Sequence, residues 1–352
     1  MIPGFATPEG SERFKKRFVA GKHSRAPLHS DHFRPADGLW LSSIGAGTYL
    51  GEPDEATDRI YEAGLKEAIR SGVNVLDSAI NYRNQRSERN IGRAVRELIE
   101  AQEVCRDELF LCTKGGFPPF DPETPPDAGT QGFPRMSPAF LEDQLRRSLE
   151  NFGVETLDLY YLHNPEIELG AVDRKEFSRR LEKAFQFLEK KVAEGKIRRY
   201  GVATWEGFRN APDQADHLSL EEINILARGV AGRGHHFKAV QLPLNLAMPE
   251  AWIFRNQNYG ANFLSLLEVA QKLGFLVFAS ASLLQGRLAH VGDSPLTALQ
   301  FTRSCPGLVT ALVGMKQPAH VRQNLEIAKI PPLTGEEMRN TFLKPVQNQE
   351  EK

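Results

Sequence analysis

Four residues whose side chains can deliver and steer a proton follow three successive short apolar segments: Asp77, Tyr82, Lys114 and His163. A tyrosine, whose ordinary pKa lies near ~10, keeps its proton at neutral pH and gives it up reluctantly. A lysine cation close to the phenol stabilises the tyrosinate and makes the tyrosine a better acid. These residue types and their spacing therefore predict a proton-delivery site.

The segment 157–163 shows how such a side chain is placed. Strand geometry sends Leu157, Leu159, Tyr161 and His163 to one face, so the histidine ends an apolar ladder. Each of the four polar residues has a structural explanation when it is taken alone: a satisfied histidine, an aspartate cap, a loop tyrosine or a surface lysine. Their arrival on three consecutive strands indicates one shared site.

Short apolar segments alternate with segments of helical period along most of the chain. Near-continuous apolar strands separated by helices predict a parallel sheet that is covered on both faces. Eight such units in about 270 residues fit a closed (β/α)8 TIM barrel, with the site at the carboxyl ends of its strands. The expected strands lie at 41–47, 74–79, 109–114, 157–163, 198–204, 239–245, 276–282 and 308–314. The clearest helical periods lie at 55–72, 137–153, 174–196 and 261–274.

An open doubly wound sheet is the competing architecture, because Gly45, Gly47 and Gly51 nearly form a dinucleotide fingerprint. The fingerprint requires its third glycine three positions after the second, and Leu50 stands there. These glycines instead indicate a strand end that closely approaches a ligand in the barrel mouth.

Composition excludes several classes of protein. The chain has 352 residues, 41% hydrophobic and 25% charged, and a formal net charge of −1, so no basic surface for nucleic acid is expected. No run of about 18 apolar residues predicts a membrane span. Three cysteines, Cys105, Cys112 and Cys305, are too few and too widely spaced for a disulfide framework or a four-cysteine zinc site. We expect reduced thiols in a cytoplasmic protein.

No low-complexity linker divides the chain, so we expect a single barrel domain over residues 31–330. Residues 1–30 are basic without an apolar segment, which argues against a secretory signal and leaves open an organellar transit peptide or, as we expect, a poorly ordered arm. Residues 331–352 form a C-terminal tail in this interpretation.

Two long segments after strands, 115–136 and 246–263, predict loops at the barrel mouth. The first is expected to act as a lid or pocket wall. Their aromatic residues are candidates for the wall of an apolar substrate cavity: Phe117, Phe120, Trp252 and Phe254. His235 and His236 have no third ligand at metal spacing and are expected in an exposed loop.

From about residue 32 to residue 328 the sequence resembles the aldo-keto reductases. The resemblance is carried by HFRPADGLWLSSIGAGTYLG, DSAINY, the lysine of CTKGG, LDLYYLHNPE, GKIRRYGVAT, AVQLPLN, LLQGRL and the segment SPLTALQFTRSCPGLVTALVGMKQPAHVRQNL. It implies a (β/α)8 barrel closed at its bottom by an N-terminal hairpin. It also implies hydride transfer from a reduced nicotinamide dinucleotide, usually NADPH, to an aldehyde or ketone.

The resemblance assigns a role to each of the four residues. Tyr82 would donate the proton to the carbonyl oxygen, which general acids accelerate ~10²–10⁴-fold. Lys114 would lower the pKa of Tyr82, and Asp77 would hold the lysine charged and in place. His163 would hydrogen-bond the substrate oxygen and orient the carbonyl.

The resemblance also implies a set of cofactor-binding residues. Lys316 would contact the adenosine 2′-phosphate, which favours NADP over NAD, although NAD stays possible. The full set is Asp77, Thr204, Gln241, Leu283, Gln285, Arg287, Lys316, Gln323 and Asn324.

The chain departs from the family pattern at three places. Ala203 and Thr204 replace the usual Ser-Asn pair, Ser280 replaces an aromatic that stacks on the nicotinamide, and His320 replaces an arginine. Trp205 is a candidate for the missing stacking surface. These departures leave open a second class, a dinucleotide-binding redox-sensing or regulatory barrel with little turnover. A barrel glycosidase would need two carboxylates at strand ends, and Asp77 alone is well placed. The expected partner is a small carbonyl substrate; the sequence predicts no oligomeric state.

Overall fold

Near-continuous apolar strands pair in parallel and close on themselves in the computed structural model, which describes residues 1–19, 27–119, 135–289 and 295–343. The barrel order is β11-β12-β3-β4-β5-β6-β7-β8, so each strand neighbours the next barrel strand along the chain. The predicted (β/α)8 barrel and its eight strand segments are confirmed. The strands are β3 (Ile44–Gly47), β4 (Val75–Asp77), β5 (Phe110–Gly115), β6 (Leu159–His163), β7 (Tyr200–Ala203), β8 (Phe237–Pro243), β11 (Leu276–Ser280) and β12 (Leu308–Gly314).

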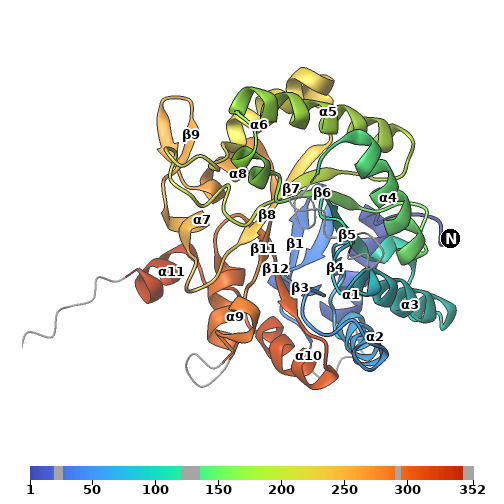
Figure 1. Cartoon of the computed structure of the whole chain (residues 1–352). Coiled ribbons are helices and arrows are strands. Elements are labelled where there is room, and N and C mark those ends of the chain that lie inside the picture. The colour runs from blue at the N-terminus through green and yellow to red at the C-terminus, as the bar shows by residue number, and fades with distance from the viewer. Residues whose placement is uncertain (20–26, 120–134, 290–294, 344–352) are drawn as a thin grey trace, which may run out of the picture.

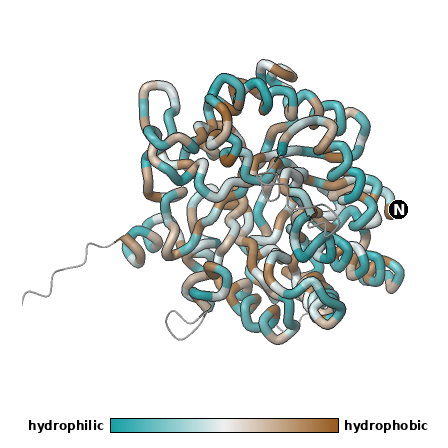
Figure 2. Tube along the Cα trace, in the orientation of Figure 1, coloured by the Kyte–Doolittle hydropathy of each residue, from teal (hydrophilic) through white to brown (hydrophobic). Residues whose placement is uncertain are grey.

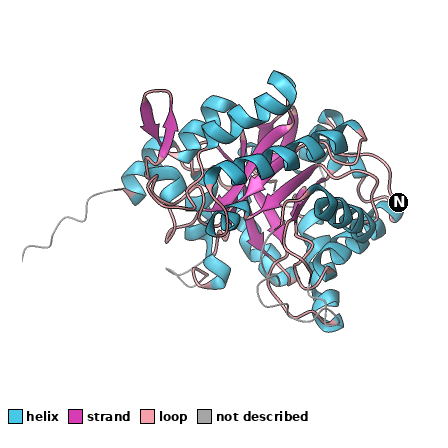
Figure 3. Ribbon diagram, turned by 45° about the horizontal axis from the view of Figure 1, so that its top comes forward, coloured by secondary structure: helices cyan, strands magenta, loops and turns pink. Residues whose placement is uncertain are grey.

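Helices surround the strands, as Figures 1 and 3 show. Helix starts and ends follow local chemistry: the Asp54 carboxylate accepts the Thr57 N–H at the start of α2, and left-handed Gly153 ends α4. The helices around the barrel are α2 (Glu55–Arg70), α3 (Arg86–Glu100), α4 (Pro138–Phe152), α5 (Arg174–Ala193), α6 (Leu220–Ala231), α8 (Leu266–Leu273), α9 (Pro295–Ser304) and α10 (Pro318–Leu325). The shorter helices are α7 (Glu250–Ile253) and α11 (Gly335–Phe342), with 3₁₀ turns η1 (Ser30–His32), η2 (Arg106–Glu108), η3 (Pro165–Gly170), η4 (Gly232–Gly234), η5 (Leu284–Gly286) and η6 (Glu326–Lys329).

The helix expected over residues 261–274 begins later than its apolar pattern predicts. Its first residues form β10 (Asn262–Leu264), which pairs with β9 (Gln257–Tyr259), and α8 starts only after Ser265. The side chains of Ser265 and Glu268 form a capping box there, and this cap fixes the helix start.

The strands separate two apolar layers. Inside the barrel, Phe110, Tyr161 and Phe278 are completely buried. The ring centroid of Phe278 lies 6.0 Å from that of Phe110 and 6.4 Å from that of Tyr161. Outside it, a larger cluster fills the space between strands and helices. Hydrophilic positions concentrate on the outer helices in Figure 2. The interior is therefore a packed core that supports the residues at the strand ends.

Two N-terminal segments close the bottom of the barrel. The predicted hairpin is present as β1 (Phe33–Ala36) and β2 (Leu39–Ser42). The expectation of a poorly ordered arm is wrong for α1 (Pro8–Val19), where Phe14 is completely buried, 6.1 Å from Phe33 between ring centroids. An amphipathic helix formed because the basic segment also carries an apolar stripe, which the charges obscured.

Two further expectations from composition concern the state of the cysteines and the presence of membrane-spanning helices. All three cysteines are free thiols. Within the described ranges, no helix combines the length and apolarity needed to span a bilayer.

Candidate active site

Three strand ends bring the predicted proton-delivery residues to one rim. Asp77 is the last residue of β4, Lys114 lies near the end of β5, and His163 is the last residue of β6. These strands are parallel neighbours, so their carboxyl ends share one face of the barrel. Tyr82 follows β4 in the next loop and contacts the same group. The structure therefore brings all four predicted residues together.

Lys114 and Asp77 form a buried ion pair. The lysine Nζ donates to Asp77 Oδ2 at 2.5 Å and to the Ser78 carbonyl at 2.7 Å, and the two charged residues are 1% and 4% exposed. Burial lowers the pKa of Lys114, but the charges of Asp77 and Tyr82 more than compensate, so its pKa lies above the usual value. The lysine is thus held as a cation beside the phenol.

Gln241 holds the other oxygen of the same carboxylate from across the barrel. Its Nε2 donates to Asp77 Oδ1 at 2.9 Å, and the glutamine itself is 3% exposed. Because the amide nitrogen is committed to Asp77, the amide oxygen is the end of this side chain that can accept a hydrogen bond. Burial raises the pKa of Asp77, while Lys114 and Gln241 act in the opposite direction.

Tyr82 lies among two rings and one cation. Its ring centroid is 5.0 Å from Tyr49 and 5.8 Å from His163, both in edge-on contact, and 4.9 Å from Lys114 Nζ. Burial raises the pKa of the phenol above its usual value, and the lysine lowers it. The tyrosine is therefore protonated at neutral pH, with the cation beside it to stabilise the charge left after proton transfer.

An unusual turn fixes the position of Tyr82. Arg83, Asn84 and Gln85 have φ of 47°, 51° and 68°, which places three successive non-glycine residues in the left-handed region. The Arg83 guanidinium anchors this turn, because it donates to Asp58 at 2.6 Å and to Asn90 at 2.7 Å.

His163 is held as a neutral imidazole. Burial and then the Lys114 charge lower its pKa well below the usual value. Its Nδ1 is buried and has no hydrogen-bond partner among the described residues. The Phe117 ring packs edge-on against it at 4.9 Å, so an aromatic wall fixes the imidazole plane beside Tyr82. A neutral imidazole can donate one hydrogen bond to a carbonyl oxygen.

A cavity of about 510 Å³ opens in front of these residues at the barrel mouth. Its lining contains all four proton-delivery residues and Phe117. Gly47 also lines it, in agreement with the interpretation of the first-strand glycines. Among the predicted cofactor residues, the lining includes Asp77, Thr204, Gln241, Leu283 and Gln285.

The other four predicted cofactor residues do not line this cavity. Arg287 follows η5, Lys316 lies between β12 and α10, and Gln323 and Asn324 belong to α10. Arg287 and Gln323 are exposed, whereas Asn324 is 4% exposed. Their cofactor roles stay predictions.

The residues of the cavity fit an extended polar ligand. Thr204 Oγ1 lines the cavity and is buried without a partner among the described residues, and the Gln241 amide oxygen can accept a hydrogen bond. The lining continues past Ser280 to Gln285 and Gly286, so polar groups follow the cavity away from Tyr82. The departures at Ala203, Thr204 and Ser280 fall within this lining, and so does Trp205, whereas the departure at His320 lies in α10 and outside it. A nicotinamide dinucleotide placed along this cavity would lie near the Gln241 amide at one end and near the exposed residues Gln285 and Gly286 at the other.

Sequence reasoning missed the residue that fixes the loop after β7. Glu166 in η3 is 2% exposed, and its Oε1 accepts the N–H groups of Trp205, Glu206 and Gly207 at 2.8, 3.2 and 3.4 Å. Burial raises the pKa of this carboxyl to about 7. The acidic residue directly after LHNP was the available signal, although only the fold brings it under this loop.

Tyr49 was also missed, although it belongs to the quoted segment GAGTYLG. Of the aromatic residues proposed for the cavity wall, Phe117 lines it, whereas Trp252 packs on Phe301 at 5.8 Å and Phe254 does not line the cavity. Trp252 lies on α7 and Phe254 directly follows it, and neither lines the cavity. Phe120, with most of the proposed lid, lies outside the described residues.

The histidine pair before β8 is placed differently from the expectation of an exposed loop. His235 is 5% exposed, and His236 Nδ1 contacts Glu189 at 2.7 Å. Within the described part of the chain, no group of three metal-ligating side chains exists.

Comparisons with known proteins agree with this geometry. A family model described as Aldo/keto reductase family matches residues 43–228. The chain is 23% identical over 303 residues to the uncharacterized oxidoreductase YqkF of Bacillus subtilis, which covers 78% of this chain and 84% of that protein. It is 34% identical over 134 residues to 2,5-diketo-D-gluconic acid reductase B of a Corynebacterium species, over 38% of each chain.

Solved structures share the barrel. An aldo/keto reductase from Klebsiella pneumoniae in complex with NADP and acetate superposes with a TM-score of 0.60 at 23% identity, over 89% of this chain and 95% of that one. Glycerol dehydrogenase from Gluconobacter oxydans superposes with a TM-score of 0.62 at 21% identity, over 91% and 98%. At these identities the likeness establishes the fold.

Proposed function

Because the chain belongs to the aldo/keto reductase family, we propose that it reduces an aldehyde or ketone to an alcohol with Tyr82 as the general acid. Membership makes the chain an oxidoreductase that transfers hydride between a reduced nicotinamide dinucleotide and a carbonyl group. The observation that carries the assignment of the acid is the Asp77–Lys114–Tyr82 arrangement at the floor of the cavity.

Tyr82 protonates the carbonyl oxygen as negative charge develops there. The proton leaves the phenol, and the Lys114 cation stabilises the tyrosinate that remains. The lysine stays charged because Asp77 holds it at 2.5 Å, and Gln241 in turn holds Asp77. These contacts exist before any ligand arrives, so the acid does not have to be assembled during the reaction.

His163 orients the carbonyl. Its low pKa makes it a neutral hydrogen-bond donor and a poor competitor of Tyr82 for the role of acid. Its ring lies 5.8 Å from the Tyr82 ring, so one carbonyl oxygen between them is within reach of both side chains. The edge-on contact with Phe117 keeps the imidazole in that orientation.

The bound dinucleotide supplies the hydride. The amide oxygen of Gln241 and Thr204 Oγ1, which has no partner in the described ranges, would hold the nicotinamide carboxamide, and Trp205, 38% exposed at the rim, offers a stacking surface near Ser280. Lys316 is the cation assigned to a 2′-phosphate, which makes NADPH the proposed donor, with NADH as the weaker one.

Tyr82→Phe tests the assigned acid. We expect NADPH oxidation with a panel of aldehydes and ketones to fall ~10²–10⁴-fold, because the phenol proton is lost while the ring contacts remain. NADPH binding, followed by nicotinamide fluorescence, should stay nearly unchanged. Tyr259→Phe, in β9 away from the cavity, is the matched control. Activity retained in Tyr82→Phe would refute the assignment, and a wild-type protein that binds NADPH but reduces no carbonyl would support the regulatory barrel instead.

The partner in this proposal is a small carbonyl compound that fits between Phe117 and Tyr49 in a mouth of about 510 Å³. A cytoplasmic location is part of the proposal and rests on the three free thiols.

A further inference from the structure

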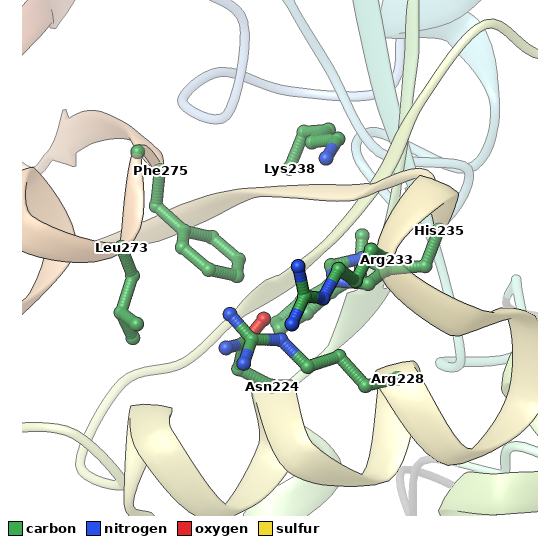
Figure 4. A pocket seen from close by; sticks show the side chains of 9 residues that line it. Asn224, Arg228, Arg233, His235, Lys238, Leu273 and Phe275 are labelled. Carbon is green, nitrogen blue, oxygen red and sulfur yellow. The ribbon is translucent and has the colours of Figure 1, made fainter.

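A second cavity lies at the opposite end of the barrel, where β8 begins. It has a volume of about 370 Å³ and lies between the end of α6, the turn η4 and the start of β11 (Figure 4). Phe237, the first residue of β8, lines it, whereas Gln241 on the same strand lines the active-site cavity. Four residues of strand separate these positions by roughly 13 Å, so the two cavities are distinct.

The charges around this cavity are of one sign. Arg228, Arg233 and Lys238 line it, and no acidic side chain of the described residues does. None of these three cations has a hydrogen bond or ion pair from its side chain to the described residues; Arg228 and Arg233 are exposed, and Lys238 is half-buried. Unpaired like charges around a concave surface create a positive potential that favours an anion.

Helix electrostatics explain only part of this arrangement. Arg228 lies in the last turn of α6, where a cation complements the negative end of the helix dipole. Arg233 belongs to η4 and Lys238 to β8, so both lie beyond the helix. Figure 4 shows the guanidinium groups of Arg228 and Arg233 close together, with Lys238 apart from them.

Polar side chains in the lining give a second, independent observation, because one of their atoms, His235 Nδ1, is buried without a partner among the described residues. Asn224 is 3% exposed, lines the cavity and makes no side-chain hydrogen bond within the described ranges. Its amide lies beside the two guanidinium groups in Figure 4. His235 is 5% exposed, and its Nδ1 also has no partner there. Buried polar groups without partners are uncommon and indicate a missing ligand or water.

Glu189, whose charge acts on His235, is already engaged. Glu189 accepts hydrogen bonds from Tyr200 Oη, from the His236 N–H and from the His236 ring. Burial lowers the pKa of His235, and the charges of Lys238 and Arg228 act in the same direction while Glu189 opposes them. A bound anion would therefore supply the negative charge that the described lining of this cavity lacks.

We infer that this cavity binds a phosphate monoester, with its phosphate between Arg228 and Arg233 and its organic part against Phe275. Two guanidinium forks match the geometry of phosphate oxygens, and the Asn224 amide adds a neutral donor. The ring of Phe275 faces the guanidinium groups across the cavity and supplies an apolar surface. A cavity of this volume holds a small ester and excludes an intact dinucleotide.

Calorimetric titration of the full chain with phenyl phosphate tests the inference. Saturating NADP⁺ and constant ionic strength keep the probe out of the active-site cavity and hold screening fixed. We expect saturable binding that is at least about tenfold weaker in Arg228→Gln/Arg233→Gln, because two charge-assisted contacts are lost. Arg146→Gln/Arg147→Gln on α4 removes the same charge elsewhere and should bind like wild type. Circular dichroism confirms folding of each variant.

Two further measurements keep the inference falsifiable if the double variant is unstable. Asn224→Asp places a carboxylate beside the phosphate and should abolish binding. Inorganic phosphate should bind more weakly than phenyl phosphate, because it has no group to contact Phe275. Absence of saturable binding, or equal affinity in the double variant and in wild type, would overturn the site, and equal affinity for the two probes would overturn the role of Phe275. The test does not depend on carbonyl reduction, since binding alone is measured.

Discussion

The two sides of the barrel mouth differ in how their functional residues are held. At the ends of β4, β5 and β6, the polar side chains bind one another: Lys114 to Asp77, and Asp77 to Gln241. On the side of β11, β12 and α10, the predicted cofactor residues Gln285 and Lys316 make no side-chain hydrogen bond to the described residues. The first side is organised by the protein alone, whereas the second waits for a ligand.

The difference follows from where each residue lies. A side chain at the end of a buried strand leaves water when the barrel folds, so it must find a partner within the protein. A side chain on a loop or an outer helix keeps its water and has no such requirement. Catalytic groups can therefore be fixed in advance, and cofactor contacts form on binding.

The largest effect is expected from a variant that disrupts the hydrogen-bonded side chains at the ends of β4, β5 and β6. Lys114→Met removes the cation beside Tyr82 and leaves Asp77 buried without a counter-ion. We expect activity to fall at least ~10²–10⁴-fold and the free energy of unfolding to fall by about 3–5 kcal/mol. Steady-state kinetics and urea denaturation measure the two losses.

The double variant Lys114→Met/Asp77→Asn separates these two losses. Removal of the orphaned charge should restore much of the stability and none of the activity. A double variant as unstable as Lys114→Met would contradict the buried-charge explanation.

A smaller effect is expected at the boundary between the two sides, where Glu166 fixes the loop that carries Trp205. Its pKa of about 7 lies above the unfolded value of 4.5, so the folded protein holds this proton more tightly. Stability from this group is fully present below pH ~4.5 and falls as the pH rises to ~7. Relative to Glu166→Gln, wild type should lose on the order of 2–3 kcal/mol across that window.

Urea denaturation at several pH values measures this difference. The exposed residue Glu336, changed to glutamine, is the control and should leave the pH dependence of wild type unchanged. A constant difference between wild type and Glu166→Gln from pH 5 to pH 8 would show that the carboxyl ionises normally.

The smallest effect should fall on the ligand-dependent side. Lys316→Ala removes a point charge from the proposed 2′-phosphate contact, so the Kd for NADPH should rise about tenfold with kcat nearly unchanged. The Kd for NADH should not move. Lys329→Ala in η6 removes an exposed cation as the control. An equal rise for both dinucleotides would place Lys316 away from the 2′-phosphate.

The organised side was also the more predictable one. Asp77, Lys114 and His163 end strands whose apolar patterns are strong, so their common rim followed from the barrel itself. The bond from Gln241 to Asp77 was not predictable, because it depends on which residues face each other across the closed barrel. Glu166 escaped for the same reason, since it acts on a loop about 40 residues further along the chain.

Predictions from local sequence were wrong where a polar or charged segment is buried by the tertiary fold. The basic N-terminal segment looked unstructured, yet Phe14 anchors α1 on the hairpin. The histidine pair was expected in an exposed loop, yet His235, which lies two residues before β8, is 5% exposed. In both cases tertiary burial outweighed a polar local composition.

The left-handed turn after Tyr82 has a consequence for mutational tolerance. A left-handed conformation costs an ordinary residue about 1–2 kcal/mol, and Arg83, Asn84 and Gln85 adopt it in succession. Whether a substitution is tolerated at these positions should therefore depend on its preference for the left-handed conformation more than on its size or polarity. Glycine and asparagine should be favoured, and valine and isoleucine excluded. Asp58 inherits the same importance although it lies 25 positions before Arg83, because it anchors the arginine that keeps the turn closed. The requirement to position the proposed general acid, Tyr82, therefore also restricts substitutions at Asp58 in α2, a residue that does not line the active-site cavity.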